Sequence, residues 1–125
     1  MKRSAGVRST VLLIMAALAV QNAKAGSAVS TDGHGHLIYS YGHLKEIDEQ
    51  NVLELGRLRY GPNVRILAAS NVAGYGAIAV ARTGTGWVAG VALGHSTRAE
   101  AEQLAIERCL RRGGSNPRIK WEFRG

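Results

Sequence analysis

The sequence predicts one folded domain of the mixed α+β class. We expect two tandem hairpin-helix-strand units that form one sheet, with two helices on one face of it. Three observations lead to this prediction: an internal repeat, strand-like segments bounded by glycine-rich turns, and two segments with apolar residues at helical spacing. The chain has 125 residues, of which 46% are hydrophobic and 20% charged. These proportions are typical of one globular domain and unlike a disordered or collagen-like chain.

The repeat appears when the chain is aligned with itself at an offset of 53 positions. Residues 49–66 then face residues 102–119, and eight of these eighteen pairs are identical: Glu49/Glu102, Gln50/Gln103, Glu54/Glu107, Arg59/Arg112, Gly61/Gly114, Asn63/Asn116, Arg65/Arg118 and Ile66/Ile119. With a shift of one residue, Gly42-His43 also pairs with Gly94-His95. We therefore expect a single domain over residues 26–125, built from two related halves at 26–69 and 74–125.

The first 25 residues have the three parts of a secretory signal peptide. A basic start with Lys2, Arg3 and Arg8 precedes the apolar run VLLIMAALAV, and Ala-Lys-Ala at 23–25 offers a cleavage site. The run of ten residues is too short to span a bilayer, which needs about twenty. A buried N-terminal helix is the alternative. We expect cleavage near Ala25, a periplasmic or secreted protein, and no membrane anchor after cleavage.

Removal of this segment changes the charge of the chain. It takes away four of the 16 basic residues and none of the nine acidic ones, so the net charge falls from +7 to +3. Part of the basic character thus belongs to a targeting peptide, and we expect no nucleic acid as a partner. Cys109 is the only cysteine, so no internal disulfide can form.

In the first half, residues 37–41 read as a strand and residues 45–59 as a helix. Val52, Leu55 and Gly56 are expected on the inner face of that helix. The turn Tyr-Gly-Pro-Asn at 60–63 ends it, and residues 64–69 are expected to be extended.

In the second half, residues 77–81 and 87–93 read as the strands of a hairpin that turns through Arg-Thr-Gly-Thr-Gly at 82–86. A helix follows up to about Arg112, with Thr97 and Glu100 as a capping box. Cys109 falls on its buried face, where we interpret it as a small core residue and not as a nucleophile.

The last strand alternates, and this alternation gives the candidate partner-binding surface. Ile119, Trp121 and Phe123 are expected on a packed face, opposite a charged one. The open sheet face is predicted to present Arg65, Arg118, Lys120 and Arg124, and the helix ends to present Arg59, Arg111 and Arg112. Guanidinium groups bind carboxylates and phosphates bidentately, so this surface suits an anionic partner. An ordinary solvated face is the alternative.

The four histidines are the remaining candidates for chemistry. His34 and His36 are spaced to present two imidazoles to Zn²⁺ or Cu²⁺, but nothing selects a third ligand. His43 and His95 occupy equivalent positions in the two halves, where they could act as bases or ligands or could simply pack locally. We assign no metal, no cofactor and no catalytic residue from the sequence.

Several motifs of the second half resemble a family of small exported bacterial domains of unknown function. They are Tyr-Gly-Ala-Ile-Ala at 75–79, Gly86-Trp87, Ser-Thr-Arg-Ala-Glu-Ala-Glu at 96–102, and Cys109. Members of this family have signal peptides, and some are immunity proteins against secreted antibacterial toxins. The resemblance implies no enzymatic activity. The family pattern places a second cysteine after the helix, whereas residues 113–116 contain none, so a disulfide is not implied here.

Together these features predict an exported, non-enzymatic protein-binding module whose partner is another protein. An inhibitor or immunity protein against a secreted toxin or enzyme is the form we expect. The alternative is a small histidine-dependent hydrolase or metal-binding protein centred on His43 and His95. The sequence leaves the identity of the partner and the oligomeric state open.

Overall fold

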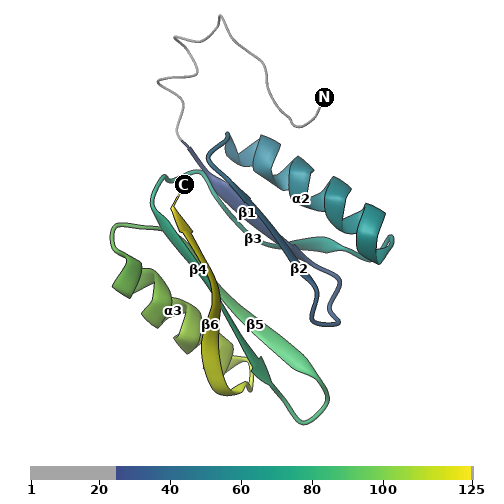
Figure 1. The fold of residues 1–125 in the computed structure, drawn as a ribbon, viewed down its shortest axis with the longest axis vertical. Coiled ribbons are helices and arrows are strands. Elements are labelled where there is room, and N and C mark those ends of the chain that lie inside the picture. The colour runs from purple at the N-terminus through teal and green to yellow at the C-terminus, as the bar shows by residue number, and fades with distance from the viewer. Residues whose placement is uncertain (1–24, 125) are drawn as a thin grey trace, which may run out of the picture.

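A computed structural model describes residues 25–124, and the predicted signal peptide lies outside these residues except for Ala25. The chain forms two successive units of hairpin, helix and strand (Figure 1). The first unit consists of β1 (Ser27–Thr31), β2 (Leu37–Tyr41), α2 (Lys45–Tyr60) and β3 (Arg65–Ser70). The second consists of β4 (Tyr75–Arg82), β5 (Trp87–His95), α3 (Arg98–Arg111) and β6 (Ser115–Arg124).

The strands form two antiparallel sheets of three strands each, in the orders β2-β1-β3 and β5-β4-β6. The mixed α+β class and the tandem units are confirmed, but the expected single sheet is instead two sheets. The physical reason is that the last strand of each unit returns to its own hairpin and pairs with the first strand. Each unit therefore completes its own sheet.

The two sheets pack face to face, with one helix on the outer side of each (Figure 1). Apolar side chains from both sheets form the core between them: Val29, Leu37, Ile78, Val91 and Phe123. The helices are therefore on opposite outer faces of the molecule, and the expectation of two helices on one face is wrong. Because every sheet face is covered, the central strands β1 and β4 are buried almost throughout.

Small residues bring α3 close to its sheet. Ala77, Ala79 and Ala81 of β4 point toward α3, where they meet alanines and Cys109 of the helix. The Cys109 thiol is fully buried, which agrees with its interpretation as a core residue. Because alanine alternates with Ile78 and Val80 along β4, the small side chains face α3 and the larger ones face the other sheet.

A β-bulge at Lys120 changes which way the last strand faces. Trp121 lies opposite Ile78 and Ile119 opposite Ala79, so Lys120 has no partner on β4. As a result, Ile119 packs against the α3 core, whereas Trp121 packs into the core between the sheets. The prediction of a single packed face along β6 is therefore wrong, because a bulge inserts one extra residue and shifts the alternation.

Local sequence signals predicted the positions of most helices and strands. Thr97 caps α3, since its Oγ1 accepts a hydrogen bond from the amide of Glu100 at 3.1 Å. The boundaries of both helices differ from the predicted ones by one residue. Among the described residues, no helix combines the length and apolar character that crossing a membrane would require.

Candidate functional site

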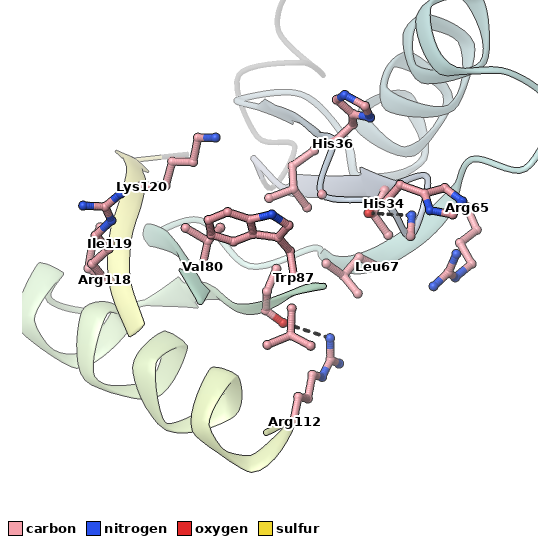
Figure 2. Close-up of a pocket in the computed structure, with 16 residues that line it drawn as sticks. His34, His36, Arg65, Leu67, Val80, Trp87, Arg112, Arg118, Ile119 and Lys120 are labelled. Atoms are coloured by element: carbon pink, nitrogen blue, oxygen red, sulfur yellow. Dashed lines mark hydrogen bonds between the residues drawn. The ribbon is translucent and has the colours of Figure 1, made fainter. Parts of the chain in front are cut away.

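A pocket of about 600 Å³ lies at one end of the interface between the two sheets. Both units contribute to it (Figure 2). The first supplies the turn between β1 and β2 and the start of β3, and the second supplies parts of β4, β5 and β6 and the residue after α3. The floor is apolar and includes Leu37, Leu67 and Val80, which also belong to the core between the sheets.

The rim of this pocket carries four permanent positive charges, from Arg65, Arg112, Arg118 and Lys120. All four residues are exposed, and His34 and His36 lie beside them. None of the lining residues is acidic. Within residues 25–124, no carboxylate forms an ion pair with any of the four cations. The pocket therefore combines a positive rim with an apolar floor, which suits a ligand that has both an anionic and an apolar part.

Strand register explains how β6 brings two cations to the pocket. Arg118 lies directly opposite Val80 of β4, and directly opposed residues share one face of a sheet. Val80 packs toward the other sheet, so Arg118 is on that side too. Lys120 reaches the same pocket as the extra residue of the bulge.

Arg65 comes from the first residue of β3 in the other unit. It lies opposite Thr31, the last residue of β1. Its Nη1 is so close to Gly33 that a Cβ placed there would be 3.2 Å away. The guanidinium group thus lies against the turn between β1 and β2, at the side of the pocket opposite β6 (Figure 2).

Arg112, the residue directly after α3, has two roles. Its Nη1 donates a hydrogen bond to the carbonyl oxygen of Ala89 at 3.0 Å, while the side chain also lines the pocket (Figure 2). One turn earlier, Nη1 of Arg108 donates to the carbonyl oxygen of Val91 at 2.7 Å. Because β5 is an edge strand, these two side chains satisfy carbonyl groups that no neighbouring strand reaches.

The turn between β1 and β2 is held by Asp32. One oxygen of its carboxylate accepts from the amides of His34 at 2.7 Å and His36 at 3.2 Å, and the other contacts Nδ1 of His36 at 2.6 Å. Burial alone would raise the pKa of Asp32, but these hydrogen bonds and the His36 charge outweigh it and hold that pKa below its usual value. The His36 ring also stacks on Tyr60 of α2, with ring centroids 4.1 Å apart.

Trp87 lies in the centre of the pocket, between the two groups of cations (Figure 2). It is the first residue of β5 and is 46% exposed. A Cβ on Gly35 would be 3.6 Å from its Cδ1, so the turn of the first unit packs against the indole of the second. The Arg82 guanidinium lies 4.7 Å from the centroid of the Trp87 ring, which is within the range of a cation–π contact.

The structure thus brings together three of the four predicted partner-binding residues, namely Arg65, Arg118 and Lys120. Arg124 is not one of the residues that line the pocket. It lies six residues beyond Arg118 on β6, about 20 Å along the strand, and its guanidinium is 5.1 Å from the ring centroid of Tyr75. The expected open sheet face does not exist, because the other sheet and the helices cover those faces.

The four histidines make their hydrogen-bond and stacking contacts with residues close to them in the sequence or in the same unit. His34 and His36 belong to the turn before β2 and not to an extended strand. His43 is paired with Asp48 of α2, and His95 with Glu100 of α3 at 3.5 Å. Among residues 25–124, no three His, Cys, Asp or Glu side chains are grouped closely enough to hold a metal ion.

The contact between His43 and Asp48 is shorter than the contact between His95 and Glu100. Asp48 is fully buried, and its Oδ1 accepts from Ser40 Oγ at 2.6 Å and lies 2.8 Å from His43 Nδ1. Its Oδ2 accepts from the His43 amide at 3.4 Å. The imidazole itself is 54% exposed. Asp48 therefore ties the start of α2 to the end of β2, and it orients an accessible imidazole.

No family model, no curated protein and no solved structure matches the chain. The resemblance to exported domains of unknown function therefore stays a prediction from the motifs. The pocket is defined by geometry alone.

Sequence reasoning missed the position of Trp87 and the approach of Arg112 to the pocket. Both depend on how the two units face one another, which no local pattern encodes. One available signal was the small-large alternation of β4, because a strand with apolar residues on both faces must be covered on both. That signal indicates a second layer over the sheet and hence a junction where a pocket can form.

Proposed function

We propose that this chain is an exported, non-enzymatic protein-binding module that inhibits a secreted toxin or enzyme and receives acidic groups of that partner in the cationic pocket. One observation carries the proposal: both units together place four cations and no carboxylate around one pocket. Like charges that share a pocket repel one another and gain nothing from each other in the free protein. They become favourable when a complementary anionic surface binds.

Three further features support a protein partner. The four cations are exposed at the rim, so a protein surface can reach them. The sequence of residues 1–25 favours export, which removes most nucleic acid as a competitor. The resemblance of the second half to exported domains, some of which are immunity proteins, points to the same kind of partner.

The test is affinity capture of the full-length chain expressed in its native host. The variant Arg118→Glu/Lys120→Glu reverses two pocket charges, and Arg124→Glu is the matched control on the same strand. We expect one protein to co-purify at equal stoichiometry with the wild type and with the control, and to be lost with the pocket variant. The activity of the captured partner should fall when the wild-type chain is added back. Equal capture by all three chains, or no partner at native expression levels, would contradict the proposal.

The pair of His43 and Asp48 favours a second candidate, a histidine-dependent hydrolase. A carboxylate on Nδ1 orients an imidazole as it does in general-base catalysis. Ser40 donates its proton to Asp48 and not to His43, however, so it is not placed as the activated nucleophile. If this candidate is right, His43→Ala abolishes hydrolysis of ester and peptide substrates by the purified chain. The pocket variant Arg118→Glu/Lys120→Glu should then have little effect on that hydrolysis.

A further inference from the structure

The cations of the pocket form two groups that face each other across Trp87. Arg118 and Lys120 lie on β6, on one flank of the indole, and Arg65 lies on the other, with Arg112 below (Figure 2). In the second sheet, β4 separates β6 from β5. Arg65 belongs to β3 of the other sheet, so the two flanks come from different units, and the Trp87 ring lies between them (Figure 2). A ligand that contacts both flanks therefore has to cross the exposed face of the indole.

Between the two flanks the surface is apolar. The Trp87 ring is partly exposed, and the half-buried side chains of Leu67 and Val80 line the same pocket. A ligand that spans the flanks therefore lays its middle part against an indole and aliphatic side chains. Burial of that part stabilises the complex by the hydrophobic effect, while each end forms charge-assisted hydrogen bonds.

From this arrangement we propose that the pocket binds a short acidic segment of the partner, with a carboxylate side chain on each side of an apolar side chain. The inference rests on the proposed function and adds the chemistry of the segment that is recognised.

The distribution of charge favours such a segment over a nucleic acid. Outside the pocket, the exposed basic residues of α2 and α3, such as Arg57, Arg59 and Arg98, share their helices with the exposed acidic residues Glu46, Glu54 and Glu100. A polyanion needs a basic surface that follows its backbone beyond one site. An acidic peptide segment needs only the two flanks.

Four capped peptides test the proposal by calorimetric titration against the full-length chain. Ac-GEGLEG-NH2 carries both acids and the apolar residue. Ac-GQGLEG-NH2 and Ac-GEGLQG-NH2 each lack one acid, and Ac-GEGSEG-NH2 lacks the apolar side chain. We expect the first peptide to bind about tenfold more tightly than each of the other three. Only this peptide should both bind tightly and strongly shift the NMR resonance of the Trp87 indole N–H. The Trp87→Phe variant identifies that resonance, because the variant lacks it.

Protein variants locate the two ends of the peptide. Arg65→Gln and Arg118→Gln should each weaken binding of Ac-GEGLEG-NH2 about tenfold, and Arg124→Gln should leave it unchanged. Thermal unfolding of each variant checks that the fold is retained. Loss of binding in only one of the two pocket variants would overturn the two-flank arrangement. Equal affinity for the one-acid peptides, or tighter binding of a deoxythymidine oligonucleotide, would also overturn the inference.

Failure of this inference is distinguishable from failure of the proposed function. If no peptide binds, but capture of the whole partner is still lost with Arg118→Glu/Lys120→Glu and retained with Arg124→Glu, then the protein-binding function stands and the acidic-segment chemistry is wrong. If partner capture is also insensitive to the pocket variant, both are wrong.

Discussion

Gly90 of β5 and Cys109 of α3 are in direct contact, so close that a Cβ on Gly90 would be 3.0 Å from the Cα of Cys109. The same Cβ would collide with the backbone carbonyl of Ala105 and the amide of Cys109. Helix and sheet therefore meet backbone to backbone at this point. The pocket depends on this contact, because Arg112 extends from the end of the same helix to Ala89, next to Gly90.

Gly90→Ala should therefore destabilise the fold. The added methyl group meets backbone atoms that cannot rotate away, so we expect a loss of about 2 kcal/mol or more in the free energy of unfolding. Gly84→Ala is the control, because a Cβ there meets nothing within 4 Å. Urea unfolding followed by circular dichroism measures both. A Gly90→Ala protein as stable as the control would show that α3 can move away from β5 at little cost.

Asp48→Asn should also destabilise the fold, by about 2 kcal/mol, because it weakens hydrogen bonds to a buried charged acceptor. Ser40 and His43 both lose a carboxylate partner in this variant. Glu46→Gln, at an exposed position on the first turn of α2, should change the free energy of unfolding by less than about 0.5 kcal/mol. Equal effects of the two substitutions would mean that the buried carboxylate contributes no more than the charge at the helix N-terminus.

Asp32 should make stability depend on pH in the acid range. The folded state holds the pKa of Asp32 below its ordinary value of 3.8. A carboxyl with a lowered folded pKa stabilises the native state above its ordinary pKa, and that contribution is lost as the pH falls through the folded value. The difference in unfolding free energy between wild type and Asp32→Asn should therefore be largest near neutral pH and shrink below about pH 4. A difference that is constant with pH would contradict this assignment.

Cys109 should have the opposite pH dependence in the alkaline range. Burial raises the pKa of its thiol above the ordinary 9.0, although a Gly90 hydrogen bond and the Arg112 charge oppose the shift. A raised folded pKa means that the stability contribution is present below the unfolded pKa and is lost as the pH rises through the folded one. Cys109→Ala should therefore lose less stability than wild type between about pH 8 and 10.

Alkylation gives an independent check on the same thiol. We expect iodoacetamide to modify Cys109 in urea-unfolded chains and only very slowly in native ones, because the thiol is buried and the thiolate is the reactive form. Rapid modification of the native protein would indicate that the contact between α3 and β5 opens on the timescale of the reaction.

Local chemistry made the secondary structure predictable. Thr97 and Glu100 marked the start of α3, and glycine-rich turns marked the hairpins. The central strand β1 was not delimited, because Ser-Ala-Val-Ser-Thr is short and half polar. Its polar members are buried in the structure, and Ser30 donates a hydrogen bond to the Val52 carbonyl at 2.8 Å.

The arrangement of the sheets and the site was only partly predictable. Arginines on β3 and β6 were recognised as candidates because their alternation is visible in the sequence. The bulge at Lys120 was not visible, since register depends on pairing with β4. Nor did any local signal place Trp87 between the two groups of cations, because that position arises only when the two units pack together.

Arg112 links two properties that are usually independent. One guanidinium closes part of the open edge of β5 and also charges the pocket. A neutral substitution there removes one of the four positive charges of the pocket and at the same time exposes a carbonyl that another chain's strand could use for pairing. A less basic pocket made by substitution at this position thus carries a risk of aggregation, so the charge of the pocket can change more freely at Arg65, Arg118 and Lys120.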